Sequence, residues 1–365
     1  MKRKNILIFF PEGNLPYSPS TINLYDELSA FHNVQILSRL HNSNEKVNNR
    51  IIEYLPRSYG RIYWIYYHFY KLLGKKGSQL NSLEAFCLFS SLKRYVKRHK
   101  IDDIIAVDLK ATAISQLVSN RVHFLSFELT DLTFLGHVNI NSLASVLIQS
   151  MERYDYLFNV PHKSVFVLPN SPVFDPSMRQ RKVPRNSLIF SGYASKGFGV
   201  YACVHFLKKF PERKMVIRGA LEGGFLESLI MFFPELLDES RLLIDTTYQD
   251  DKDMLGYLSQ FKVGFAFYDF RLSKIDNFNY WTAPSGKLYK YLAAGVPVIG
   301  INIPGFSIVQ HYKAGVLIDT LDPDSIQQAL DIIEADYESY VENAFRAAES
   351  VSFDRAVKPF IDFIS

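Results

Sequence analysis

Short apolar runs alternate along the chain with longer amphipathic stretches. Each run is rich in Val, Ile, Leu and Phe and is bounded by turn residues, which is typical of strands buried in a parallel sheet. The stretches between them repeat apolar residues at helical spacing, including one over 140–149. The predicted strands cover residues 5–10, 34–37, 101–107, 122–127, 187–191, 214–217, 241–245, 263–268, 296–300 and 315–318. We therefore predict an α/β protein with helices on both faces of parallel sheets.

The length of 365 residues indicates two domains, because a single hydrophobic core of this size is uncommon. Residues 173–186 are rich in proline and cations and show no periodicity, so we interpret them as an interdomain linker. The first domain is then expected at 1–172 and the second at 187–350. A last amphipathic helix is expected at 351–365.

Composition excludes several classes of protein. Hydrophobic residues make up 48% of the chain, so wholesale disorder is not expected. The net charge of +4 is too small to indicate a nucleic-acid partner. Cys87 and Cys203 fall in different halves and form neither a disulfide framework nor a zinc motif. No apolar run resembles a signal peptide or a membrane span, so we expect a cytoplasmic protein.

Residues 54–76 allow two interpretations. No acidic residue stands between Glu53 and Glu84, and aromatic and aliphatic residues share one helical face with cations around it. One interpretation is a core helix with a solvated basic end. The other is an interfacial helix on an anionic membrane surface, which would place the protein peripherally on the inner face of the cytoplasmic membrane. A second basic run at 93–100 adds to the latter.

Acidic residues follow two of the predicted strands in the first domain. Asp108 comes directly after 101–107, and Glu128 and Asp131 follow 122–127. Open α/β sheets bind ligands at the carboxyl ends of their strands, so these positions are where ligand groups are expected.

The stretch 281–319 has the strongest local signature. Pro284, Ser285 and Gly286 form a loop that opens a helix over 287–294, and Gly295 ends that helix. A short buried strand over 296–300 follows. A loop that leads into a helix N-terminus is a common anion-binding arrangement, because free backbone N–H groups point at the ligand.

In order and spacing this stretch resembles the donor-site signature of GT-B glycosyltransferases, especially the family 4-like retaining enzymes. The family usually has glutamate where this chain has Lys290, and often where it has Thr282. The resemblance implies a GT-B architecture, with two Rossmann-like domains of doubly wound parallel sheet facing across a cleft and a last helix returning to the first domain. The matching positions are Pro284, Ser285, Lys287, Leu288, Tyr291, Ala293, Gly295, Pro297, Val298, Pro304, Gly305 and Gly315.

The resemblance also implies a donor site in the second domain. Residues 192–197 are similar to the family's glycine and lysine loop, in which Lys196 would meet the donor diphosphate, with Arg218 as a second cation. Two cations and helix N-termini stabilise a diphosphate leaving group without a metal, so we expect no metal and no cofactor apart from the donor substrate. The candidate donor-binding residues are Gly192, Lys196, Gly197, Arg218, Asp269, Tyr280, Pro284, Ser285, Gly286, Lys287, Lys290 and Tyr291.

The roles of two lysines stay open. Lys287 either meets donor phosphate or caps its loop. Lys290 either contacts the nucleotide in place of the missing glutamate or points to solvent.

The resulting prediction is a glycosyltransferase that moves a sugar from a nucleotide sugar to a hydroxyl of a glycan or lipid-linked acceptor, in surface polysaccharide or glycolipid synthesis. Retention is implied, with the leaving phosphate deprotonating the acceptor. An inverting enzyme would need a protein base, for which Glu128 or Asp131 is the candidate catalytic residue. Two alternatives remain: a degenerate sugar-nucleotide-binding or scaffold protein, and a sugar-nucleotide epimerase.

Overall fold

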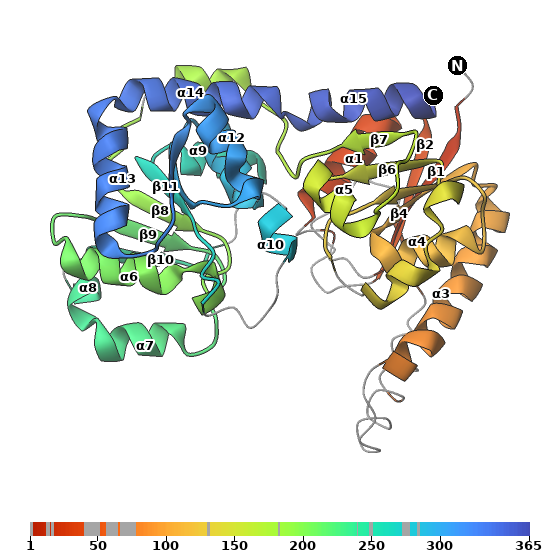
Figure 1. The fold of residues 1–365 in the computed structure, drawn as a ribbon, viewed down its shortest axis with the longest axis horizontal. Coiled ribbons are helices and arrows are strands. Elements are labelled where there is room, and N and C mark those ends of the chain that lie inside the picture. Colours follow the sequence, from red (N-terminus) through yellow and green to blue (C-terminus); the bar gives the residue numbers. More distant parts are fainter. Residues whose placement is uncertain are drawn as a thin grey trace. The chain divides into compact units, whose positions relative to one another are not determined.

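The computed structural model forms two compact units, one of Met1–Pro169 with Ala356–Ser365 and one of Asn170–Arg355 (Figure 1). We call them unit 1 and unit 2. The structure describes residues 3–11, 15, 18–39, 52–55, 65, 78–129, 132–181, 183–238, 240–247, 251–271, 278–282 and 285–365.

Unit 1 is built on a parallel sheet of seven strands in the order β3-β2-β1-β4-β5-β6-β7. The order reverses between β1 and β4, which is the topological switch point of the sheet. Its strands are β1 Asn5–Phe10, β2 Asn33–Ser38, β3 Ile52–Tyr54, β4 Asp103–Val107, β5 Val122–Leu125, β6 Ser145–Ile148 and β7 Val165–Val167. Its helices are α1 Pro19–Ser29, α3 Ser78–His99, α4 Asp108–Gln116 and α5 Met151–Leu157, with 3-10 turns at Leu132–His137 and Ile140–Ser142.

Unit 2 has a parallel sheet of six strands in the order β10-β9-β8-β11-β12-β13, with its switch point between β8 and β11. The strands are β8 Leu188–Ser191, β9 Met215–Arg218, β10 Leu242–Asp245, β11 Val263–Ala266, β12 Val298–Ile301 and β13 Gly315–Ile318. The helices are α6 Val200–Lys209, α7 Phe225–Phe232, α8 Pro234–Asp238, α9 Asp251–Leu258, α10 Phe278–Thr282, α11 Gly286–Ala293, α12 Ser307–Tyr312, α13 Pro323–Ala335 and α14 Tyr337–Ser350. Turns of 3-10 helix lie at Pro176–Gln180, Lys196–Phe198 and Pro304–Phe306.

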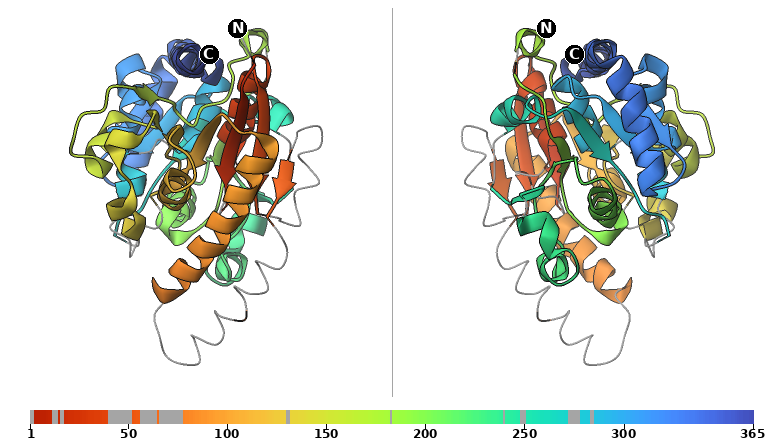
Figure 2. Two further views of the ribbon diagram at one scale, coloured as in Figure 1. Left: turned by 90° about the vertical axis from the view of Figure 1, so that its right-hand side faces the viewer. Right: turned by 90° about the vertical axis from the view of Figure 1, so that its left-hand side faces the viewer.

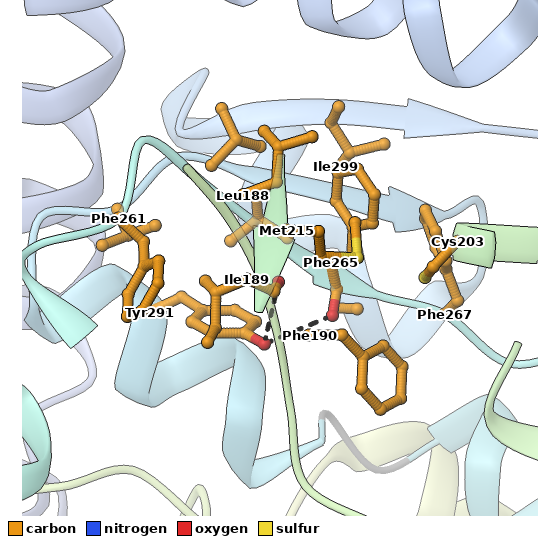
Figure 3. Packing of buried hydrophobic residues seen from close by; sticks show 14 of the residues in the cluster. Leu188, Ile189, Phe190, Cys203, Met215, Phe261, Phe265, Phe267, Tyr291 and Ile299 are labelled. Atoms are coloured by element: carbon orange, nitrogen blue, oxygen red, sulfur yellow. Dashed lines mark hydrogen bonds between the residues drawn. The ribbon is translucent and has the colours of Figure 1, made fainter. Parts of the chain in front are cut away.

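Each sheet has its own hydrophobic core. In unit 1, Leu88, Leu92 and Tyr95 of α3 belong to the core that also holds side chains of β1 and β2. Figure 2 shows α3 running across one face of this sheet. In unit 2, the strands around β8 pack their apolar side chains against α6 and α11 (Figure 3). The near-continuous burial of these strands follows from helices lying on both faces of a parallel sheet.

One predicted helix is a strand in the structure, and the expected linker falls in one of the two units. The helix predicted over 140–149 is wrong: Ser145–Ile148 is β6, because this short β-branched run is buried in the sheet between β5 and β7. The expected linker, 173–186, lies within unit 2, where Met178 is buried and Arg181 packs against Gly256.

The C-terminal helix α15, Phe353–Ile364, continues from unit 2 into unit 1. Within unit 1 its Phe360 ring lies 5.4 Å from His123 and 5.7 Å from Phe166. The backbone carbonyl of Ile364 accepts a hydrogen bond from Lys4.

Most of 54–76 lies outside the described residues, so the predicted interfacial helix is not described. Among the helices of the described part of the chain, none is both long and apolar enough to cross a bilayer.

Candidate functional site

The loops after β8 and β9 cross in direct contact at the carboxyl edge of the unit 2 sheet. The Gly192 N–H donates to the Arg218 carbonyl at 2.8 Å. Both glycines that follow these strands have left-handed φ, +125° at Gly192 and +124° at Gly219. A Cβ on Gly219 would stand 2.2 Å from the Gly192 oxygen, so only glycine fits there. The result is a backbone crossing beside the switch point.

The predicted lysine loop lies beside this crossing. The Lys196 N–H donates to Glu222 at 2.9 Å, and the Gly197 carbonyl accepts from the Asp269 N–H at 2.9 Å. The Lys196 side chain is exposed, with its Nζ 5.8 Å from the centroid of the Tyr201 ring. The loop is therefore tied to the segments after β9 and β11, while its cation faces solvent.

Lys287 is an unusual cation among the described residues of unit 2. Its ammonium is shielded from solvent and has no hydrogen-bond partner among the described residues. Nζ lies 4.4 Å from the Phe190 ring centroid and 4.9 Å from that of Phe198, and a Cβ on Gly192 would lie 3.5 Å from Lys287 Cε. Burial lowers the pKa of Lys287 to about 8, so most of it is charged at pH 7.

The first turn of α11 adds to this positive site. Lys287 is the second residue of the helix, and the N-cap residue Ser285 makes no side-chain hydrogen bond to the helix. Cations are unfavourable at a helix N-terminus because the macrodipole is positive there. Among the described residues, a helix start without a side-chain cap therefore lies beside the shielded Lys287 ammonium, which makes this part of unit 2 positive.

The Arg218 guanidinium contacts residues of β10, α9 and the loop between them. Its guanidinium donates to the Thr247 carbonyl at 3.2 Å and to the Met254 sulfur at 3.1 Å, and it lies 4.9 Å above the Tyr257 ring. Its Nε is 3.7 Å from Asp245. These contacts hold the side chain beside β10 and α9, so it is not an exposed partner for Lys196.

Tyr291 lies in the core of unit 2, beside the candidate site. The side chain is fully buried, and its hydroxyl accepts the Ser191 N–H at 2.7 Å. The same oxygen lies 3.4 Å from the Phe265 carbonyl (Figure 3). The Tyr291 ring is therefore part of the core and fixes the end of β8, and the donor contact predicted for this residue stays a prediction.

The other donor-site candidates differ in their surroundings. Asp269 is buried and binds Arg271 through both carboxylate oxygens, each at 3.0 Å. Tyr280 stacks on Tyr268 with ring centroids 4.5 Å apart. Lys290, half-buried, stands one turn after Lys287 on α11. Gly286 opens the same helix, and Pro284 lies outside the described residues.

At the switch point of unit 1, Asp108 clamps the end of β5. Its Oδ1 accepts the backbone N–H groups of Phe127 at 2.7 Å and Glu128 at 3.0 Å. Arg153, fully buried, donates to the Phe127 carbonyl at 2.6 Å from the other side. The Glu128 side chain is exposed next to this clamp, and Asp131 lies outside the described residues.

Asp108 lies outside the predicted set of site residues, although it directly follows a strand of the sheet. It has a left-handed φ of +66°, which is uncommon for a residue other than glycine. Burial raises the pKa of Asp108 to about 7, with the two backbone hydrogen bonds opposing and the Glu128 charge adding. A strained, buried carboxyl group at a switch point is a functional candidate.

No protein-family profile matches the chain, and no curated protein matches its sequence. Solved structures do match. HepE of Anabaena in complex with UDP has a TM-score of 0.70 at 14% identity over 99% of both chains. A glycosyltransferase from Rickettsia africae has a TM-score of 0.70 at 11% identity over 100% of both chains. Sucrose-phosphate synthase from Thermosynechococcus elongatus has a TM-score of 0.66 at 13% identity, over 99% of this chain and 98% of the other.

The chain has the GT-B fold. In unit 2 of this GT-B chain, Gly192, Lys287 and the start of α11 lie together, and Lys196 lies on the loop that follows Gly192. Among the described residues no group of three or more His, Cys, Asp or Glu is placed to hold a metal ion.

Proposed function

We propose that this protein is a glycosyltransferase that takes a sugar from a nucleotide sugar and passes it to a hydroxyl of a glycan or lipid-linked acceptor. One observation supports this most strongly: the Lys287 ammonium is shielded from solvent at the start of α11 and has no hydrogen-bond partner among the described residues. The matched structures support it as well, since HepE was solved with UDP-glucose and the other two are named a glycosyltransferase and sucrose-phosphate synthase.

The chemistry of Lys287 favours a diphosphate ligand. A buried charge without a partner is costly, and an anion that replaces the lost hydration offsets this cost. The Phe190 and Phe198 rings give the ammonium only cation–π contacts, which are weaker than a charge-assisted hydrogen bond to phosphate. Lys196 on its exposed loop is the second cation that we assign to the donor. In the transition state, negative charge grows on the leaving diphosphate, and these cations stabilise it.

The acceptor side is assigned to unit 1. Asp108 and Arg153 hold the Phe127–Glu128 peptide from both sides, and this fixes the backbone from which Glu128 projects. We propose a retaining reaction without a metal, in which the leaving phosphate takes the acceptor proton. Glu128 is the base to test if the product has inverted configuration.

A role in surface polysaccharide or glycolipid synthesis is part of the same proposal. It is supported by the basic face of α3, on which Lys93, Arg94, Lys97 and Arg98 are exposed. Such a face is attracted to anionic lipid, which would bring the protein to a lipid-linked acceptor.

The proposal is tested by a thermal-shift screen against UDP-, GDP-, CMP- and ADP-sugars. A ligand that binds the native state raises the melting temperature by mass action. We expect one nucleotide class to raise it, and we expect Lys287→Met to lose at least tenfold in affinity for that class. The control is Lys208→Met, which removes an exposed lysine of α6. If no sugar nucleotide binds the unaltered protein, the proposal fails.

A second candidate is a binding protein without turnover. It is favoured by Lys290, which stands on α11 where the resemblance expects a glutamate. Saturable binding with no release of free nucleotide under any acceptor would support it. Release only when acceptor is added would instead support the transferase, and turnover of the sugar nucleotide without acceptor would indicate an epimerase.

A further inference from the structure

A continuous set of aromatic side chains lies at the carboxyl edge of the unit 2 sheet. We call it the aromatic strip, and its members are Tyr193, Phe198, Tyr268, Phe270, Tyr280 and Trp281. Tyr268 and Tyr280 stack at 4.5 Å, and Phe198 lies 5.6 Å from Tyr268. Phe270 joins the strip at 6.2 Å from Tyr268 and lies 5.2 Å from Trp281. The rings therefore form one packed surface and not a scatter of separate contacts.

The strip lies where this kind of sheet binds ligands. Its members follow β8 and β11, the two strands that flank the switch point, or belong to α10 (Figure 1). Crevices at such points are the usual ligand sites of open parallel sheets. Phe198 is the member that meets the buried cation, with its centroid 4.9 Å from Lys287 Nζ.

The two ends of the strip are open to solvent. Tyr193 is 48% exposed and Trp281 is 43% exposed, whereas Tyr268 between them is buried. Large aromatic side chains that stay exposed on a packed aromatic floor mark a binding surface, because exposing them is otherwise unfavourable.

We propose that Trp281, supported by Phe270, stacks against the pyranose ring of the donor sugar. This rests on the proposed function, in which Lys287 holds the diphosphate. A diphosphate held there has a nucleoside on one side and a sugar on the other, and the strip has an exposed end on each side of Phe198. Tyr193 adjoins the crossing of the β8 and β9 loops, so it belongs to the nucleoside side. Trp281 lies at the other end of the strip and precedes the start of α11, so we assign it to the sugar side.

The chemistry of the two surfaces fits this assignment. The axial C–H groups of a pyranose make one face of the ring apolar, while its hydroxyls point outward to hydrogen-bond. An indole offers a large, rigid apolar face with an electron-rich π system that attracts such C–H groups. Trp281 would therefore select sugars that have an uninterrupted C–H face.

Fluorescence tests the proposal directly. The chain has 2 tryptophans, so Trp64→Phe leaves Trp281 as the single reporter. Its emission is recorded with UDP and with UDP-glucose, or with the matching pair for the nucleotide that the screen selects. We expect the sugar nucleotide to shift or quench the emission and the nucleoside diphosphate to leave it nearly unchanged.

Binding to variants, measured by calorimetry, separates the alternatives. We expect Trp281→Ala to weaken the affinity for the sugar nucleotide about tenfold and to change the affinity for the nucleoside diphosphate by no more than about twofold. Trp281→Phe should recover most of the lost affinity. The matched control is Phe232→Ala, which removes an exposed aromatic ring of α7 outside the strip. An equal loss for both ligands, or an equal emission change with both, would overturn the assignment in favour of base stacking. Unchanged affinities would overturn it outright. If neither ligand binds the unaltered protein, the proposed function itself has failed.

Discussion

Two carboxylates at opposite ends of β4 have opposite pKa shifts. Asp108, directly after the strand, has its pKa raised to about 7 by burial. Asp103, at the start of the strand, is also buried, but hydrogen bonds from His123 and Arg121 outweigh the desolvation and lower its pKa to about 2. The two groups make stability depend on pH in different windows, so each serves as a control for the other.

For Asp108 the sign follows from linkage. An unfolded Asp releases its proton near pH 3.9, whereas folded Asp108 holds it to about pH 7. The contribution of Asp108 to the free energy of unfolding is therefore complete below about pH 4. It falls by up to about 4 kcal/mol as the pH rises to about 7. Asn keeps an oxygen for the Phe127 and Glu128 amides and tolerates a left-handed φ. We expect Asp108→Asn to stabilise the protein at pH 8 more than at pH 5 in urea unfolding.

The Asp103→Asn variant should behave differently in the same urea experiment. The stabilising contribution of the Asp103 carboxylate is complete above about pH 4 and is lost only toward pH 2. The variant should therefore lose similar stability at pH 5 and at pH 8. Parallel pH profiles for Asp108→Asn and the unaltered protein would show that Asp108 titrates normally.

At the level of elements, α11 joins the core to the candidate site. Tyr291 on its buried face accepts the Ser191 N–H, and Lys287 on the same helix lies under Gly192. The contact between α11 and the end of β8 thus supports the loop that follows β8. The positions of Lys287 and Gly192 depend on this junction more than on the loop itself.

The junction is tested by Tyr291→Phe. Removing the hydroxyl leaves the buried Ser191 N–H without its acceptor, which costs about 1–3 kcal/mol. We expect lower stability and several-fold weaker sugar-nucleotide binding, because the loop loses its support. The control is Tyr289→Phe, which removes the hydroxyl of another buried tyrosine of α11. Equal effects of the two substitutions would refute the role of the Ser191 contact.

At the level of the whole molecule, much of the sheet architecture was predictable because it depends on local patterns. Buried β-branched runs mark most strands, and Gly295 with its left-handed φ of +65° ends α11 as its position suggests. The exceptions depend on distant contacts. Ser145–Ile148 is a strand because it pairs between β5 and β7. Which polar side chains are buried is equally non-local: Lys287 and Asp108 owe their shifted pKa values to burial, and Arg218 is withdrawn by partners after β10.

The C-terminal helix α15 allows a test of whether the two units unfold independently. Phe360 of α15 is fully buried in unit 1, so Phe360→Ala should cost that unit about 3 kcal/mol. Phe363, on the same helix and 45% exposed, should cost about 1 kcal/mol when replaced by Ala. Scanning calorimetry with and without donor identifies the unit 2 transition as the one that the ligand raises. Because the units have separate cores, only the other transition should move in Phe360→Ala; if both move together, the units unfold as one cooperative body.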